Sequence, residues 1–97
     1  LDAVAEHPTW AKAHLMLGLS YYEREDNTSA IYYLKKAHLL DSSDGYSLCY
    51  LGVISYDRGS YKAAEEYLRE AEKLAKNDNY LKNIIDTYKE CVAREVA

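Results

Sequence analysis

Residues 48–68 read LCYLGVISYDRGSYKAAEEYL, and a related stretch, HLMLGLSYYEREDNTSAIYYL, stands 34 residues earlier at positions 14–34. At this offset small residues fall on small ones and large residues on large ones. The matching pairs are Gly18 and Gly52, Ala30 and Ala64, Tyr22 and Tyr56, and Leu34 and Leu68. A glycine inside a helix costs about 1 kcal/mol relative to alanine. Its recurrence predicts close crossings of antiparallel helices, with Gly18 against Ala30 and Gly52 against Ala64.

Turn-forming residues divide the chain around these stretches into short helical segments. No alternation typical of a strand persists in any part of the chain, so the sequence predicts an all-α fold. We expect helices over residues 10–24, 28–40, 46–57, 61–76 and 79–95, preceded by the tail of another helix over residues 1–6. The expected N-caps are Thr28, Ser60 and Asn79.

The charge balance narrows the classes of partner. Twelve Lys and Arg residues against sixteen Asp and Glu residues give a net charge of -4. No basic field is therefore expected to attract nucleic acid or an anionic membrane surface. No apolar run approaches the roughly 20 residues that span a bilayer, and no signal peptide is apparent. We expect a soluble, cytoplasmic protein.

Cysteine and histidine do not form a pattern typical of catalysis or metal binding. Cys49 and Cys91 are expected to be free thiols, because their helical register separates them too far for a disulfide. His7, His14 and His38 lack the spacing of metal ligands, so we expect surface or packing roles. The acidic residues between positions 65 and 72 alternate with basic ones, which is typical of a solvated helix face. No enzyme activity, metal or cofactor is expected.

These repeats resemble the tetratricopeptide repeat (TPR) family, whose signature is W-x2-L-G-x2-Y followed by A-x3-F and P. The first copy is carried by His14, Leu17, Gly18, Tyr21, Ala30, Leu34 and Ala37, and the second by Leu48, Leu51, Gly52, Ala64, Leu68 and Ala71. The chain departs from the signature where His14 and Leu48 replace the bulky aromatic, Ser55 replaces a tyrosine, and Ser42 and Lys76 replace the closing proline. The remaining alternative is a related repeat of helical hairpins.

The resemblance implies a right-handed α-solenoid of antiparallel helix hairpins and a C-terminal fragment of a longer array. In this register residues 1–10 end a preceding repeat, residues 11–44 and 45–78 are complete repeats, and residues 79–97 form a capping helix. The last helix carries an apolar stripe opposite a polar face, as expected of a terminal cap.

In this family the first helix of each repeat lines a concave groove that holds peptides, and the resemblance implies the same here. The implied partner-binding residues are Leu15, Leu19, Tyr22, Glu23, Tyr46, Cys49, Tyr50, Val53, Tyr56, Asp57 and Tyr80. Leu15, Leu19, Cys49 and Val53 are expected to be exposed in the groove, so that Val53→Glu would leave the fold intact. Glu23 and Asp57 lie 34 residues apart and would favour Lys or Arg in the ligand.

Two functions from different classes fit this surface. The first is a protein–protein interaction module, an adaptor or scaffold whose groove binds an apolar or basic-apolar peptide segment of a partner. The second is a structural element of self-assembly, in which the tyrosines serve packing alone. Self-association is also expected through the N-terminal end, around Leu1 and Val4.

Overall fold

A computed structural model describes residues 10–96, which are helical apart from short turns. The helices of this part of the chain are α2 (Ala11–Glu23), α3 (Asn27–Leu40), α4 (Gly45–Asp57), α5 (Tyr61–Ala75) and α6 (Asn79–Val96). Each observed end lies within one residue of the expected one, and the all-α prediction is confirmed. The expected helix over residues 1–6 and the expected contacts of Leu1 and Val4 lie outside the described residues.

Three helices begin at an aspartate that accepts a backbone hydrogen bond. Asp26, Asp44 and Asp78 accept from the N–H groups of Ser29, Tyr46 and Leu81 at 3.2, 2.9 and 3.0 Å, respectively. The prediction that Thr28 and Asn79 cap these helices was wrong, because a carboxylate stands just ahead of each and also interacts favourably with the helix dipole. Ser60 does stand at an N-cap position, but its side chain makes no capping hydrogen bond.

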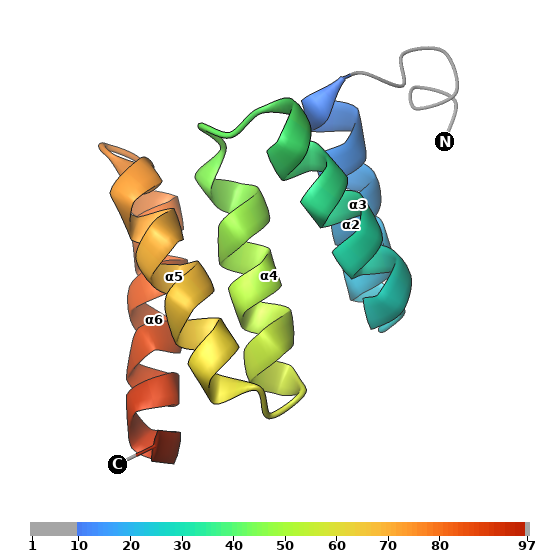
Figure 1. Cartoon of the computed structure of the whole chain (residues 1–97). Coiled ribbons are helices and arrows are strands. Elements are labelled where there is room, and N and C mark those ends of the chain that lie inside the picture. The colour runs from blue at the N-terminus through green and yellow to red at the C-terminus, as the bar shows by residue number, and fades with distance from the viewer. Residues whose placement is uncertain (1–9, 97) are drawn as a thin grey trace.

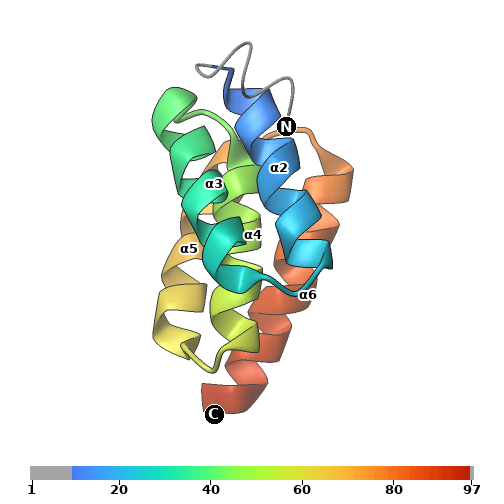
Figure 2. The same cartoon turned by 90° about the vertical axis from the view of Figure 1, so that its right-hand side faces the viewer.

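Helix α4 occupies the centre of the molecule, between α2 and α3 on one flank and α5 and α6 on the other (Figure 1). Consecutive helices run in opposite directions (Figure 1). A view turned by 90° shows α3 and α5 on one side of α4, and α2 and α6 on the other (Figure 2). Helix α4 packs against all four, whereas within residues 10–96 no close backbone approach joins α3 to α5 or α2 to α6. Two long sides of α4 are therefore left without a helix directly over them.

Gly18 and Gly52 lie where the two helices of a pair cross. A Cβ atom added at Gly18 would lie 2.9 Å from Leu34 Cγ, and one added at Gly52 would lie 2.9 Å from Leu68 Cγ. The packing requirement is thus present, but the expected partners were wrong, because the nearest atoms belong to these leucines rather than to Ala30 and Ala64. The two alanines are fully buried and serve the core instead.

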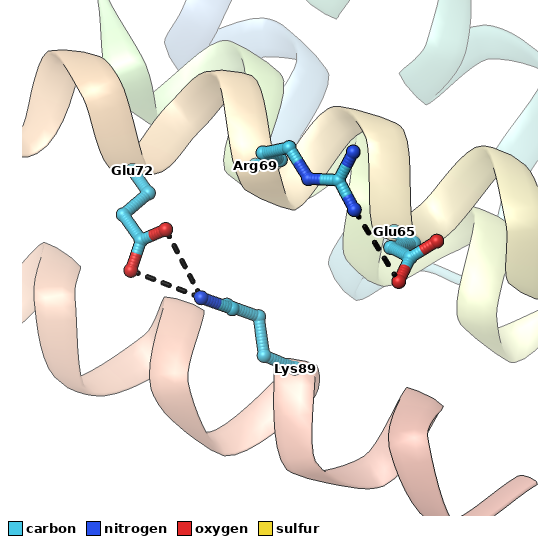
Figure 3. Close-up of polar contacts among 4 residues, drawn as sticks. All are labelled: Glu65, Arg69, Glu72 and Lys89. Carbon is cyan, nitrogen blue, oxygen red and sulfur yellow. Dashed lines mark hydrogen bonds and ion pairs between the residues drawn. The ribbon is translucent and has the colours of Figure 1, made fainter. Parts of the chain in front are cut away.

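The outer surfaces of α5 and α6 carry exposed ion pairs. Arg69 lies 3.5 Å from Glu65 one turn earlier on α5, and Lys89 of α6 donates to both carboxylate oxygens of Glu72 at 3.0 Å (Figure 3). Exposed pairs of this kind contribute about 0–1 kcal/mol each. The prediction of a solvated, paired helix face is confirmed, and the stability of the fold comes mainly from the apolar core around α4.

Candidate functional site

Tyrosines from α2, α4 and α6 gather over the side of α4 that lies between α2 and α6. We name this surface the tyrosine face, and its members are Tyr22, Tyr46, Tyr50, Tyr56, Tyr80 and Tyr88. The ring centroids of Tyr22 and Tyr50 lie 5.8 Å apart, which joins α2 to α4. Those of Tyr56 and Tyr88 lie 5.7 Å apart at 77°, which joins α4 to α6 edge to face. Tyr22 and Tyr56 are 34 residues apart and so occupy equivalent positions on α2 and α4. Tyr80 and Tyr88 are eight residues apart on α6 and point toward the same side of that helix.

The pKa values of two hydroxyl groups of this face, those of Tyr22 and Tyr46, are raised. Burial raises the pKa of Tyr22 to about 12, with smaller contributions from Tyr88 and from the Asp57 carboxylate. Burial likewise raises the pKa of Tyr46 to about 12, aided by the hydrogen bond that its hydroxyl donates to Asp78 at 2.5 Å. At neutral pH these two hydroxyls are therefore neutral.

Cys49 and Val53 do not lie on an open surface. Their exposed fractions are 0% and 1%, so the prediction that both are exposed in a groove was wrong. The physical reason is the central position of α4, since α2 and α6 both pack against it and cover its apolar residues. Burial also raises the pKa of the Cys49 thiol to about 12. Cys49 and Cys91 are both free, as expected.

Of the other residues predicted for the groove, some pack against the core and others are exposed. Leu15 and Leu19 are half-buried and pack against the core, so neither is the open apolar contact that was expected. Tyr80 is 66% exposed and is the open aromatic ring of the tyrosine face. Tyr88 was not among the residues predicted for the site, although it bridges α6 to α4 through its ring contact with Tyr56.

An acidic hollow adjoins the tyrosine face at the C-terminal ends of α2 and α4. It has a volume of about 520 Å³ and is lined by Tyr22, Glu23, Glu25, Asn27 and Asp57. Glu23 and Asp57, predicted to be neighbours from their 34-residue spacing, thus line one space. Burial raises the pKa of Asp57 above 3.8. Within residues 10–96 none of the three carboxylates forms an ion pair, so the hollow presents uncompensated negative charge.

Within residues 10–96 the structure shows no cluster of metal-ligand side chains and no helix that could span a membrane. Across residues 10–96, no three His, Cys, Asp or Glu side chains are placed to hold a metal ion. His14 is a packing residue, as expected, with its ring 6.2 Å from that of Tyr33 and its Nδ1 atom 2.9 Å from the Trp10 carbonyl oxygen. None of the helices described has the length and apolar character needed to cross a membrane.

Neither the models of protein families nor the curated proteins provide a match to this sequence. The resemblance to the TPR family therefore rests on the repeated residues themselves. The function must be argued from the side chains of the tyrosine face and the acidic hollow.

Proposed function

We propose that the chain is a protein-interaction module that binds a basic-apolar segment of a partner protein across the tyrosine face. In this proposal a Lys or Arg side chain of the ligand enters the acidic hollow, and neighbouring apolar side chains pack on the tyrosine rings. The observation that carries it is the hollow itself, where Glu23, Glu25 and Asp57 line one space without a cation among the described residues. The module holds its partner and performs no chemistry on it.

We also propose that the helices form a short array of helical hairpins. The helix pairs α2–α3 and α4–α5 would be two hairpin repeats of TPR type, and α6 would be the helix that caps them. The 34-residue period, the alternating helix direction and the equivalent crossings of Gly18 on Leu34 and Gly52 on Leu68 support this reading.

Tyrosine and acidic groups together favour a ligand that is both basic and apolar. A cation placed over an aromatic ring gains about 0.5–2 kcal/mol, the more so when water is excluded. Tyr22 offers such a ring directly beside the carboxylates of the hollow. Tyr80 adds an exposed apolar ring, and tyrosine is common at protein interfaces because one end is apolar and the other forms hydrogen bonds.

The proposal is tested by selecting short random peptides from a display library against the whole chain. The selected peptides are expected to contain Lys or Arg next to aromatic or aliphatic residues. Their affinity, measured by fluorescence anisotropy, should fall about tenfold or more in Glu23→Lys and in Tyr80→Ala. Both side chains are exposed, so neither change should alter the melting temperature.

Glu90→Lys is the matched control, because Glu90 is exposed and does not line the acidic hollow. Equal losses in Glu90→Lys and Glu23→Lys would show that net charge alone governs binding and would overturn the proposal. Failure to select any peptide, combined with self-association in sedimentation that Tyr80→Ala abolishes, would favour the self-assembly function instead.

The pH dependence of peptide binding provides a separate measure of the hollow. Asp57 attracts a basic side chain only when it is ionised, and its pKa is raised above 3.8 by burial. Affinity should therefore fall as the pH is lowered through this raised pKa, before an ordinary aspartate would be protonated. In Asp57→Asn this fall should be reduced and the affinity at neutral pH should be lower. A pH profile unchanged by Asp57→Asn would exclude this carboxylate from the site.

A further inference from the structure

The opposite side of α4 carries a second groove, between α3 and α5. Three hollows of 660, 330 and 240 Å³ adjoin one another there. Tyr67 lines all three, His38 and Leu48 line the first and third, and Leu51 lines the second and third. The shared walls make one continuous depression, which we name the α3–α5 groove.

The α3–α5 groove is mainly apolar along its floor. Leu48 and Leu51 of α4 form the floor, and Tyr67 and Leu74 of α5 line one wall. At the rim on α3, Leu39 is 83% exposed. Leu48 and Leu51 themselves are only 7% and 3% exposed, so the apolar surface open to a ligand belongs to Leu39 on α3 and to the half-buried Tyr67 and Leu74 on α5.

The length and the polarity of the groove favour a helix as its occupant. The α5 wall runs from Ala63 to Leu74, which corresponds to about 16 Å or three helical turns. An extended peptide would bring unpaired backbone N–H and C=O groups onto an apolar floor, and unpaired groups of this kind are costly to bury. A helix satisfies these groups internally and presents side chains at positions i, i+3, i+4 and i+7 to the groove.

Charges at the two ends of the groove differ in sign. Lys35 and Arg58 line the hollow near the beginning of α5, and neither forms an ion pair within residues 10–96. Glu66 and Glu70 line the hollow toward the end of α5, where Lys73 pairs with Glu70 at 3.1 Å. At this end the Nδ1 atom of His38 is buried without a hydrogen-bond partner, and such an atom is usually paired.

We propose that the α3–α5 groove binds an amphipathic helix of a second protein. The apolar stripe of this helix lies on Leu39, Tyr67 and Leu74. Its acidic residues meet Lys35 and Arg58 at one end, and its basic residues meet Glu66 at the other. This surface is separate from the tyrosine face, so the chain would join two partners on opposite sides of α4.

The test uses a display library of helices of about 14 residues, long enough to cover the groove, with the face toward the protein randomised. Selection against the whole chain should enrich an apolar stripe with acidic residues at one end and basic residues at the other. Circular dichroism should show that a selected peptide gains helix on binding. Its affinity should fall about tenfold or more in Leu39→Asp, because an exposed apolar rim contact becomes charged without disturbing the core.

Charge reversal provides the sharper test. The double variant Lys35→Glu, Glu66→Lys should weaken the selected peptide and restore binding to a peptide in which the acidic and basic ends are exchanged. The matched controls Lys62→Glu and Glu90→Lys change exposed residues that do not line the groove, and they should bind as the parent does.

Several outcomes would overturn the proposal. The first is that selection against the parent enriches helices no more than selection against Leu39→Asp. The second is that both peptides bind the charge-reversed variant equally well. The third is that Glu23→Lys abolishes binding, which would place the helix on the tyrosine face. Dimerisation in sedimentation that Leu39→Asp abolishes would identify the occupant as a second copy. The function proposed for the tyrosine face would stand in each of these cases.

Discussion

At the scale of single residues, the two helical glycines determine how closely the paired helices approach. Gly52 has no side chain, and Leu68 of α5 fills the space in which a Cβ atom would stand. Leu68 is itself fully buried, so it has little room to move aside. Close packing of this kind makes a single added methyl group costly.

We expect Gly52→Ala to destabilise the protein by about 1–3 kcal/mol through overpacking, even though alanine is the better helix former. Urea denaturation followed by circular dichroism measures the change. Ser55→Ala on the same helix is the control, since Ser55 is only half-buried. If Gly52→Ala instead raises stability, Leu68 adapts readily and the glycine is not required by packing.

Val53 provides a second prediction at this scale. Because its side chain is 1% exposed, Val53→Glu places a carboxylate in the core and should cost at least about 3 kcal/mol. The variant is expected to lose its cooperative thermal transition. Tyr80→Glu introduces the same charge at an exposed position and should melt as the parent does. A stable Val53→Glu would mean that Val53 is not enclosed by the core in solution.

At the scale of elements, Asp78 joins the beginning of α6 to the beginning of α4. One of its oxygens caps α6 through Leu81, and the other accepts from the Tyr46 hydroxyl of α4 at 2.5 Å. The hydrogen bond from Tyr46, followed by that from Leu81, holds the pKa of Asp78 below 3.8. Because the pKa of Asp78 is lower in the folded than in the unfolded state, its contribution to stability is complete above the unfolded-state pKa. This contribution is lost as the pH falls through the folded-state pKa.

Asp78→Ala should therefore lower the melting temperature at neutral pH, and Tyr46→Phe should lower it less, because the cap on α6 remains. In Tyr46→Phe the folded-state pKa of Asp78 lies closer to the unfolded value, so the loss of stability on acidification should end at a higher pH and be smaller in extent. Asn77→Ala, at the exposed neighbouring position, is the control. Calorimetry from neutral to acidic pH makes the comparison, and a Tyr46→Phe curve parallel to that of the parent would disprove the coupling.

The helices themselves were predictable, because glycine, alanine and turn residues act locally and at a fixed period. The caps were less so, since Asp26 and Thr28 are both good N-cap residues and the choice depends on how the preceding turn closes. Tyr88 could be placed on an apolar stripe from sequence, but its contact with Tyr56 of α4 depends on how α6 rotates against α4.

At the scale of the whole molecule, α4 packs against four other helices, and the repeat pattern alone did not predict this. The pattern distinguishes apolar from polar positions, but it does not tell whether an apolar position faces the core or a ligand. Cys49 and Val53 faced the core, whereas Glu23 and Asp57 reached one space as expected. The α3–α5 groove involves residues from three helices, and only the packed structure brings them together.

The reaction rate of the enclosed Cys49 thiol provides a measure of how often the folded protein opens. A thiol must reach solvent and ionise before it reacts, and Cys49 is fully enclosed with its pKa raised to about 12. Cys91 on α6 is only half-buried and serves as an internal reference. A colorimetric thiol reagent should therefore give two separate phases, and Asp78→Ala should accelerate the slow one by loosening α6. If two phases are seen, the rate of the slow phase measures how often α6 separates from α4. A single phase would mean that this separation is faster than the reaction with the reagent.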